Sequence, residues 1–124
     1  MNGDVIKFSF PAKPNYILAV RLAVSAIAER IGFNIDDIED LKVASAEACT
    51  MLLSESPDII AICITVDDGL QMNFDAEGQA PGRKPSIDEA RDLSQYLLEA
   101  LVDKCEFLRQ DDAVRGVRFY KKRQ

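Results

Sequence analysis

The 124-residue sequence contains no histidine, and this absence removes the commonest general base of enzymes. Neither a Ser/His nor a Cys/His nucleophilic pair can form without it, so a hydrolase of either kind is disfavoured. Three cysteines are present, and their odd number, wide spacing and lack of histidine partners give no zinc-type pattern. Each lies in an apolar stretch and is predicted to be a small buried side chain (Cys49, Cys63 and Cys105).

Long apolar runs and a basic surplus are also missing. No run reaches the ~20 residues of a membrane span, and the start lacks a signal-peptide pattern, so we expect a cytoplasmic protein without membrane contact. The formal net charge of −6 disfavours direct binding to nucleic acid, because phosphate binding needs a basic face. Basic residues do gather near the C-terminus, where we interpret them as cations that protect a solvated edge strand: Arg115, Arg118, Lys121, Lys122 and Arg123.

The composition is that of one soluble globular domain spanning residues 1–124, with 48% apolar and 29% charged residues. Its patterns predict the order strand, helix, helix, strand, strand, helix, strand, strand. Strands are expected at residues 5–10, 59–66, 70–75, 105–108 and 114–120. Helices are expected at residues 16–31, from 35 to about 54, and from a capping box at Ser86–Glu89 onward. This order predicts an α/β (α+β) two-layer sandwich, in which three helices cover one face of a mixed, mostly antiparallel sheet.

Local signals refine this prediction. Gly32 is expected to end the first helix in the left-handed conformation, and Asn34 to cap the second. Asp67-Asp68-Gly69 is expected to make a hairpin turn, because Asp68-Gly69 is the usual two-residue signal for one. The nearly unbroken apolar run 59–66 predicts a strand that is covered on both faces. Helical spacing predicts that one apolar stripe of the third helix lies in the core: Ala90, Leu93, Leu97, Ala100 and Leu101.

Four segments carry a resemblance to a known family: IDDIEDLKVASAEACT at 35–50, FPAKP at 10–14, VRLAVS at 20–25 and YLLEALVD at 96–103. They resemble the anti-sigma-factor serine kinases of the RsbW and SpoIIAB type, which belong to the GHKL superfamily of histidine-kinase-like ATPases. The resemblance covers nearly the whole chain. It implies the histidine-kinase-like ATPase (Bergerat) fold.

The resemblance assigns a catalytic role to Glu47, which corresponds to the glutamate that polarises the attacking hydroxyl or water in family kinases. The family asparagine that helps to hold Mg²⁺ falls four residues later, where this chain has Met51. Glu55 stands where a histidine often follows. A thioether is a poor ligand for Mg²⁺, so we expect no metal and a vestigial general base. The alternative is that Glu47 is an ordinary exposed helix residue.

The resemblance also places a vestigial adenine site at Asp75 and Gly78. Gly78 matches the glycine of the family's Asp-x-Gly motif, but Ala76 stands in the place of the aspartate that reads adenine. Asp75 lies one position early, and a shift of one residue in a strand turns a side chain to the opposite face. It could substitute only if the strand ends in a bulge.

The glycine-rich phosphate lid of the family has no counterpart before the third helix. Residues 91–95 contain no glycine. The linker 79–85 has only seven residues, too few for a mobile lid, and two prolines stiffen it. Arg83 and Lys84 are the only cations there, and we interpret them as part of a solvated turn. Three separate departures from the family pattern therefore predict that the protein binds no cofactor and does not transfer phosphate.

The leading hypothesis is an anti-sigma-factor-like regulator that acts by partner switching. The resemblance implies a sigma factor or a STAS-domain anti-anti-sigma protein as partner, and a possible homodimer. The alternative is an active serine kinase that uses Mg-ATP, with Glu47 as base and Asp75 as adenine reader. A structural interaction module unrelated to sigma factors is a third hypothesis. The acidic group at 36–40 either meets a basic protein or, as we favour, complements a helix dipole.

Overall fold

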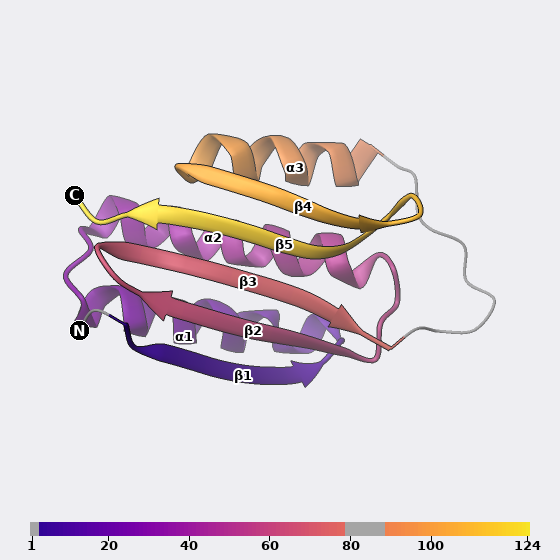
Figure 1. The fold of residues 1–124 in the computed structure, drawn as a ribbon, viewed down its shortest axis with the longest axis horizontal. Helices are drawn as coiled ribbons and strands as arrows, with labels where there is room; N and C mark the ends of the chain where they lie inside the picture. Colours follow the sequence, from indigo (N-terminus) through magenta and orange to yellow (C-terminus); the bar gives the residue numbers. More distant parts are fainter. Residues whose placement is uncertain (1–2, 79–88) are drawn as a thin grey trace.

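The structure is a computed structural model that describes residues 3–78 and 89–124. These residues form five strands, three α-helices and a short 3₁₀ helix (Figure 1). The elements are β1 (Val5–Pro11), η1 (Pro14–Tyr16), α1 (Ile17–Arg30), α2 (Ile35–Leu53), β2 (Ile59–Val66), β3 (Gly69–Glu77), α3 (Glu89–Leu101), β4 (Lys104–Gln110) and β5 (Ala113–Lys122). Their order and type confirm the sequence prediction. Arg83, Lys84 and residues 86–88 of the predicted capping box lie outside the described residues. Glu89, the last residue of that box, is the first residue of α3.

The five strands form one sheet in the order β1-β2-β3-β5-β4, and every neighbouring pair is antiparallel. The predicted mixed sheet is therefore wrong in this respect. The single helix α3 leaves β3 and β4 pointing the same way, but β5 lies between them and separates them (Figure 1). No parallel pair forms among the described strands as a result.

All three helices cover the same face of the sheet, which gives the predicted two-layer sandwich (Figure 1). The core lies between the layers, where alternate side chains of β2 and β3 are fully buried beneath the helices. On β2 the intervening side chains, Ala61, Cys63 and Thr65, are only half-buried on the open face. The prediction of a strand covered on both faces is therefore wrong. The open-face residues are small or apolar, so the sequence does not distinguish them from core residues.

The helix ends follow the predicted chemistry. Gly32 has φ +95° immediately after α1, a conformation that glycine adopts without a Cβ penalty. Asn34 Oδ1 accepts a hydrogen bond of 2.8 Å from the backbone N–H of Asp37, as an N-cap should. These two contacts fix the turn from α1 to α2.

The β2–β3 hairpin forms as predicted, with its turn at Asp67, Asp68 and Gly69. Three residues separate the paired Val66 and Leu70, and Asp67 Oδ1 accepts from the backbone N–H of Gly69 at 2.9 Å. Gly69 is not among the glycines with positive φ. It is needed because a Cβ there would collide with the backbone of Lys121 on β5.

The third helix exposes part of the stripe that was predicted to lie in the core. Its most deeply buried described side chains are Ser94 and Leu98, at 4% and 0% exposure, whereas Leu93 is 58% exposed. Ala100 is also exposed, while Leu97 and Leu101 are half-buried. The buried stripe of α3 is rotated by about one residue from the predicted one. A small polar residue, Ser94, occupies its centre, and the apolar pattern did not indicate that position.

The cysteines were only partly predicted. Cys49 is fully buried, and burial raises the pKa of its thiol to about 12. Cys63 and Cys105 are half-buried rather than buried. Among the helices of the described residues, none combines the length and apolar character that crossing a membrane requires.

Candidate functional site

Glu47 lies on the side of α2 that faces α3. Its Oε1 accepts a hydrogen bond of 2.8 Å from the hydroxyl of Ser94, a residue 47 positions later in the sequence, and this bond joins α2 to α3. Glu47 is half-buried and Ser94 is 4% exposed. The alternative of an ordinary exposed helix glutamate is therefore wrong, and this carboxylate already has a partner inside the chain.

The next turn of α2 places the thioether of Met51 where the resemblance expects the ligand for Mg²⁺. Met51 is 1% exposed and belongs to the hydrophobic core. Glu55 is 7% exposed at the end of the helix, where the Ser54 hydroxyl lies 3.4 Å from its Oε2. Among the described residues, no group of three or more histidine, cysteine, aspartate or glutamate side chains is arranged to hold a metal ion. The residues at this position therefore do not fit the Mg²⁺ that the family fold implies.

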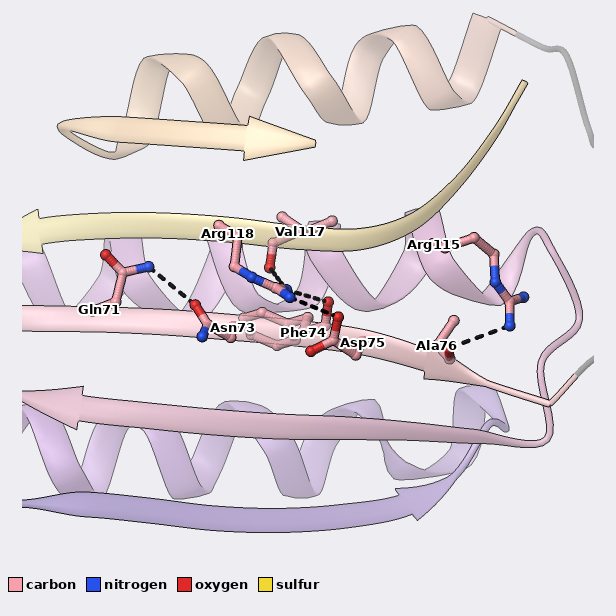
Figure 2. A network of polar contacts seen from close by, with 8 residues as sticks. All are labelled: Gln71, Asn73, Phe74, Asp75, Ala76, Arg115, Val117 and Arg118. Atoms are coloured by element: carbon pink, nitrogen blue, oxygen red, sulfur yellow. Dashed lines mark hydrogen bonds and ion pairs between the residues drawn. The ribbon is translucent and has the colours of Figure 1, made fainter. Parts of the chain in front are cut away.

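Asp75 points to the open face of the sheet, away from the helices. It forms a salt bridge of 2.8 Å with Arg118 on β5, and it shares its face with Gln71 and Asn73 (Figure 2). The β2–β3 ladder stays in register from Val66 to Ile59, so no bulge turns Asp75 toward the helix layer. The structure therefore places Asp75 and Glu47 on opposite sides of the sheet and does not bring the predicted site residues together.

Gly78 has a conformational role at the end of β3. Its φ is +81°, and a Cβ would collide with the side chain of Asp58. The Arg115 guanidinium donates a hydrogen bond of 2.7 Å to the carbonyl oxygen of Gly78. It also donates one of 3.2 Å to the carbonyl oxygen of Ala76 (Figure 2). This clamp fixes the point at which the chain leaves the sheet.

Arg115 and the other C-terminal cations were misjudged from the sequence. They do not protect an edge, because β5 is an inner strand and β4 is the edge. Lys121 is 9% exposed and donates to the carbonyl oxygen of Leu101 at 2.8 Å. Its Nζ also lies 3.6 Å from carboxylate oxygens of both Asp37 and Asp40. The alternation of Val117, Phe119 and Lys121 toward the core is the sequence pattern that could have indicated the burial of Lys121.

The C-terminal end of α1, like that of α3, accepts a hydrogen bond from a basic side chain. The Arg123 guanidinium donates to the Ile31 carbonyl oxygen at 2.7 Å. Together with the Lys121 contact, it ties the end of β5 to the C-terminal ends of two helices, where cations are favourable. The basic group at the C-terminus is thus largely occupied by structural contacts.

The Ser94–Glu47 contact gives a testable expectation. We expect Ser94→Ala to lower the free energy of unfolding by about 1–2 kcal/mol, because a hydrogen bond to a charged group is lost from a nearly buried position. Urea unfolding followed by circular dichroism measures the change. Ser25→Ala, which removes an exposed hydroxyl that donates to Leu22 on α1, is the matched control and should change stability by less than about 0.5 kcal/mol. Equal effects of the two changes would contradict the importance of the contact.

Comparison with known proteins relates the chain to one group of kinases. It is similar to the "Serine-protein kinase RsbW" of Halalkalibacterium halodurans, with 35% identity over 90% of this chain and 79% of the relative. The protein of the same name from Bacillus subtilis is 33% identical over 82% of this chain and 76% of the relative. The one from Bacillus velezensis is 35% identical over 81% and 75%. No family model matches the chain.

The fold is also similar to a solved structure. The crystal structure of the RsbU and RsbW domains of Rv1364c from Mycobacterium tuberculosis superimposes with a TM-score of 0.71 over 97% of this chain, at 15% sequence identity. The chain spans 32% of the length of that protein. This likeness confirms the predicted fold.

Proposed function

Because the chain belongs to the RsbW family of serine-protein kinases, we propose that it is an anti-sigma-factor-like regulator that acts by binding other proteins and does not transfer phosphate. The partners that the family implies are a sigma factor and a STAS-domain antagonist. Regulation would consist of exchanging one partner for the other.

The observation that carries the proposal is the burial of Met51. Family kinases place an oxygen ligand for Mg²⁺ four residues after the catalytic glutamate, whereas here that position is an apolar side chain at 1% exposure. Mg²⁺ requires oxygen ligands in near-octahedral geometry. A Glu47 carboxylate held by Ser94 and an Asp75 turned to the far face of the sheet support the same conclusion.

The test is calorimetric titration of the folded protein with Mg-ATP and Mg-ADP, with Bacillus subtilis RsbW titrated in parallel as a positive control. We expect saturable binding to the control and none to this chain at low millimolar nucleotide. Saturable binding to this chain, with phosphate transfer to a serine of a STAS-domain protein that Glu47→Ala abolishes, would establish the alternative of an active kinase.

A second measurement addresses the partner. The tagged protein is purified from its native host, and associated proteins are identified by mass spectrometry. Recovery of a sigma factor or a STAS-domain protein at near-stoichiometric amount is the expected result. Absence of both would remove the support for sigma-factor regulation and favour an unrelated interaction module.

The retained Glu47 is the observation that favours the kinase alternative. The resemblance assigns the catalytic glutamate to this position, and the Glu47 carboxylate would need only to exchange the Ser94 hydroxyl for a substrate hydroxyl. That exchange supplies a base but neither a metal ligand nor an adenine-reading group. We therefore place the kinase second.

A further inference from the structure

The strand β1 is one edge of the sheet, and no strand of the described residues pairs with its outer side (Figure 1). Its ladder with β2 shows which backbone groups point outward. The Asp4 carbonyl oxygen accepts from the Val66 N–H at 2.9 Å, so Asp4 bonds inward. Ala12 bonds inward as well, since its N–H donates to the Asp58 carbonyl oxygen at 3.0 Å. In an antiparallel ladder, residues that bond inward alternate with residues whose groups point outward. Outward N–H and C=O groups therefore belong to the odd-numbered residues of β1 that keep an N–H: Val5, Lys7 and Ser9.

The other edge strand, β4, provides the contrast. Its register against β5 shifts between Leu108 and Arg109, and Lys104 and Glu106 add further exposed charges along it. A register irregularity and several charged side chains are features that protect an edge from pairing with another chain. β1 keeps an unbroken register with β2 along its whole length, carries one charged residue, Lys7, and has a proline only at its end. It is therefore the less protected edge of the sheet.

An apolar groove of about 250 Å³ lies beside β1, where the strand meets α1 and β2. Its apolar lining is formed by Ile6, Ala26, Ile27, Ile31 and Val66. Asp4 and Arg30 also line it, one charge of each sign. Phe8 and Phe10 lie on the same side of β1 as Ile6, and all three are only half-buried. An added strand would place every second side chain on this side, so apolar side chains are favoured at those positions.

Lys7 indicates the charge that such a strand should carry. Its side chain is exposed on the open face of the sheet, and no ion pair within residues 3–78 and 89–124 includes it. Two carboxylates share the shallow surface beside it, but both belong to β3, on the far side of β2. Asp75 is already in a salt bridge, and Glu77 is exposed. Lys13, which follows the strand, adds a second exposed cation. Opposite charges on neighbouring strands attract, so an acidic residue is favoured beside Lys7.

From these observations we propose that β1 binds an extended, acidic segment of a partner protein, which adds a strand to the edge of the sheet. The backbone of the segment would bond to the outward N–H and C=O groups of Val5, Lys7 and Ser9. Its apolar side chains, at every second position, would cover Ile6 and Phe8 and enter the groove beside α1. An acidic residue between them would lie beside Lys7. The inference rests on the proposed function, since it names a surface for the same partner-binding role.

The experiment uses a designed fluorescent peptide of seven residues, the length of β1, in which isoleucine alternates with glutamate. N-methyl groups on every second backbone nitrogen block one edge of the peptide, which prevents its self-assembly and leaves the other edge free to pair. A control peptide of the same sequence is N-methylated at every residue and has no free edge. Binding to the full chain is followed by fluorescence anisotropy.

The protein variants test the edge itself. Ser9→Pro removes an outward N–H of β1 and no bond to β2, and proline is tolerated on an edge strand at such a position. Ser9→Ala is the matched control, because it changes the same side chain and keeps the N–H. Lys7→Glu tests the charge. Circular dichroism checks that each variant is folded, and Val5→Pro makes the same test at the start of the strand if Ser9→Pro does not fold.

We expect the peptide with one free edge to bind the wild type and the Ser9→Ala variant alike, and to lose at least about tenfold in affinity for the proline variant. Lys7→Glu should lose about fivefold. Failure of the wild type to bind, equal binding of the fully methylated peptide, an equal loss in Ser9→Ala, or no loss in Lys7→Glu would each overturn the proposal. Self-association of the wild type that Ser9→Pro abolishes would overturn it as well, by making a second copy the occupant. These outcomes leave the nucleotide titration and partner identification untouched, so a failure here is distinct from a failure of the proposed function.

Discussion

Replacing Lys121 by methionine is expected to lower the free energy of unfolding by about 3 kcal/mol, because it leaves a largely buried carboxylate without its cation. The side chains of Lys121 and Asp37 are only 11% and 14% exposed, and Asp37 Oδ2 is buried without a hydrogen-bond partner among residues 3–78 and 89–124. Methionine keeps the length and the apolar stem of lysine, so the change tests the charge rather than the packing. The same substitution removes the hydrogen bond to the Leu101 carbonyl oxygen.

Urea unfolding measures this effect, and a fall in melting temperature of roughly 10 °C should accompany it. Lys122→Met is the control, because the neighbouring side chain is exposed and its change should stay within about 0.5 kcal/mol. Adding Asp37→Asn to Lys121→Met should recover part of the loss, since the unpaired charge is then removed. A Lys121→Met protein as stable as the Lys122→Met protein would mean that the ion pairs do not hold α2 and α3 to β5.

The elements of the fold were predictable because each has a local signal. The N-cap at Asn34, the left-handed Gly32 and the alternation of Leu70, Met72 and Phe74 all depend on a few neighbouring residues. Strand order did not follow from such signals. Placing β5 between β3 and β4 is a matter of long-range pairing, and the error about the C-terminal cations came from taking β5 as an edge.

The site was predictable only in part, for the same reason. The resemblance assigned a catalytic role to Glu47, which stays a prediction, and the structure shows only that Glu47 lies on α2 beside α3. Its partner Ser94 is distant in sequence, so no local sequence pattern could predict the hydrogen bond between Glu47 and Ser94. Asp75 shows the opposite case: period-two alternation predicted that it would face away from the helices unless a bulge intervened, and the regular ladder with β2 settles that condition.

The burial of Met51 leads to a second large expected effect, because it bears on whether catalysis can be restored by one change. Met51→Asn reinstates the residue that the family uses to hold Mg²⁺. In this chain, however, position 51 is 1% exposed and lies among core side chains. We expect the variant to lose about 3 kcal/mol of stability, since an apolar side chain is removed and an amide is buried without designed partners.

Urea unfolding and Mg-ATP calorimetry on the same preparation test this together. Thr50→Asn is the matched control, since it puts the same amide one residue earlier at an exposed position of α2. The expected result is a destabilised Met51→Asn protein that still fails to bind Mg-ATP, because Asp75 remains on the far face of the sheet. A Met51→Asn protein that is as stable as the control and binds Mg-ATP would mean that position 51 can open toward a ligand. The chain would then be one substitution away from the nucleotide site of its kinase relatives, and the proposal of a purely binding role would fail.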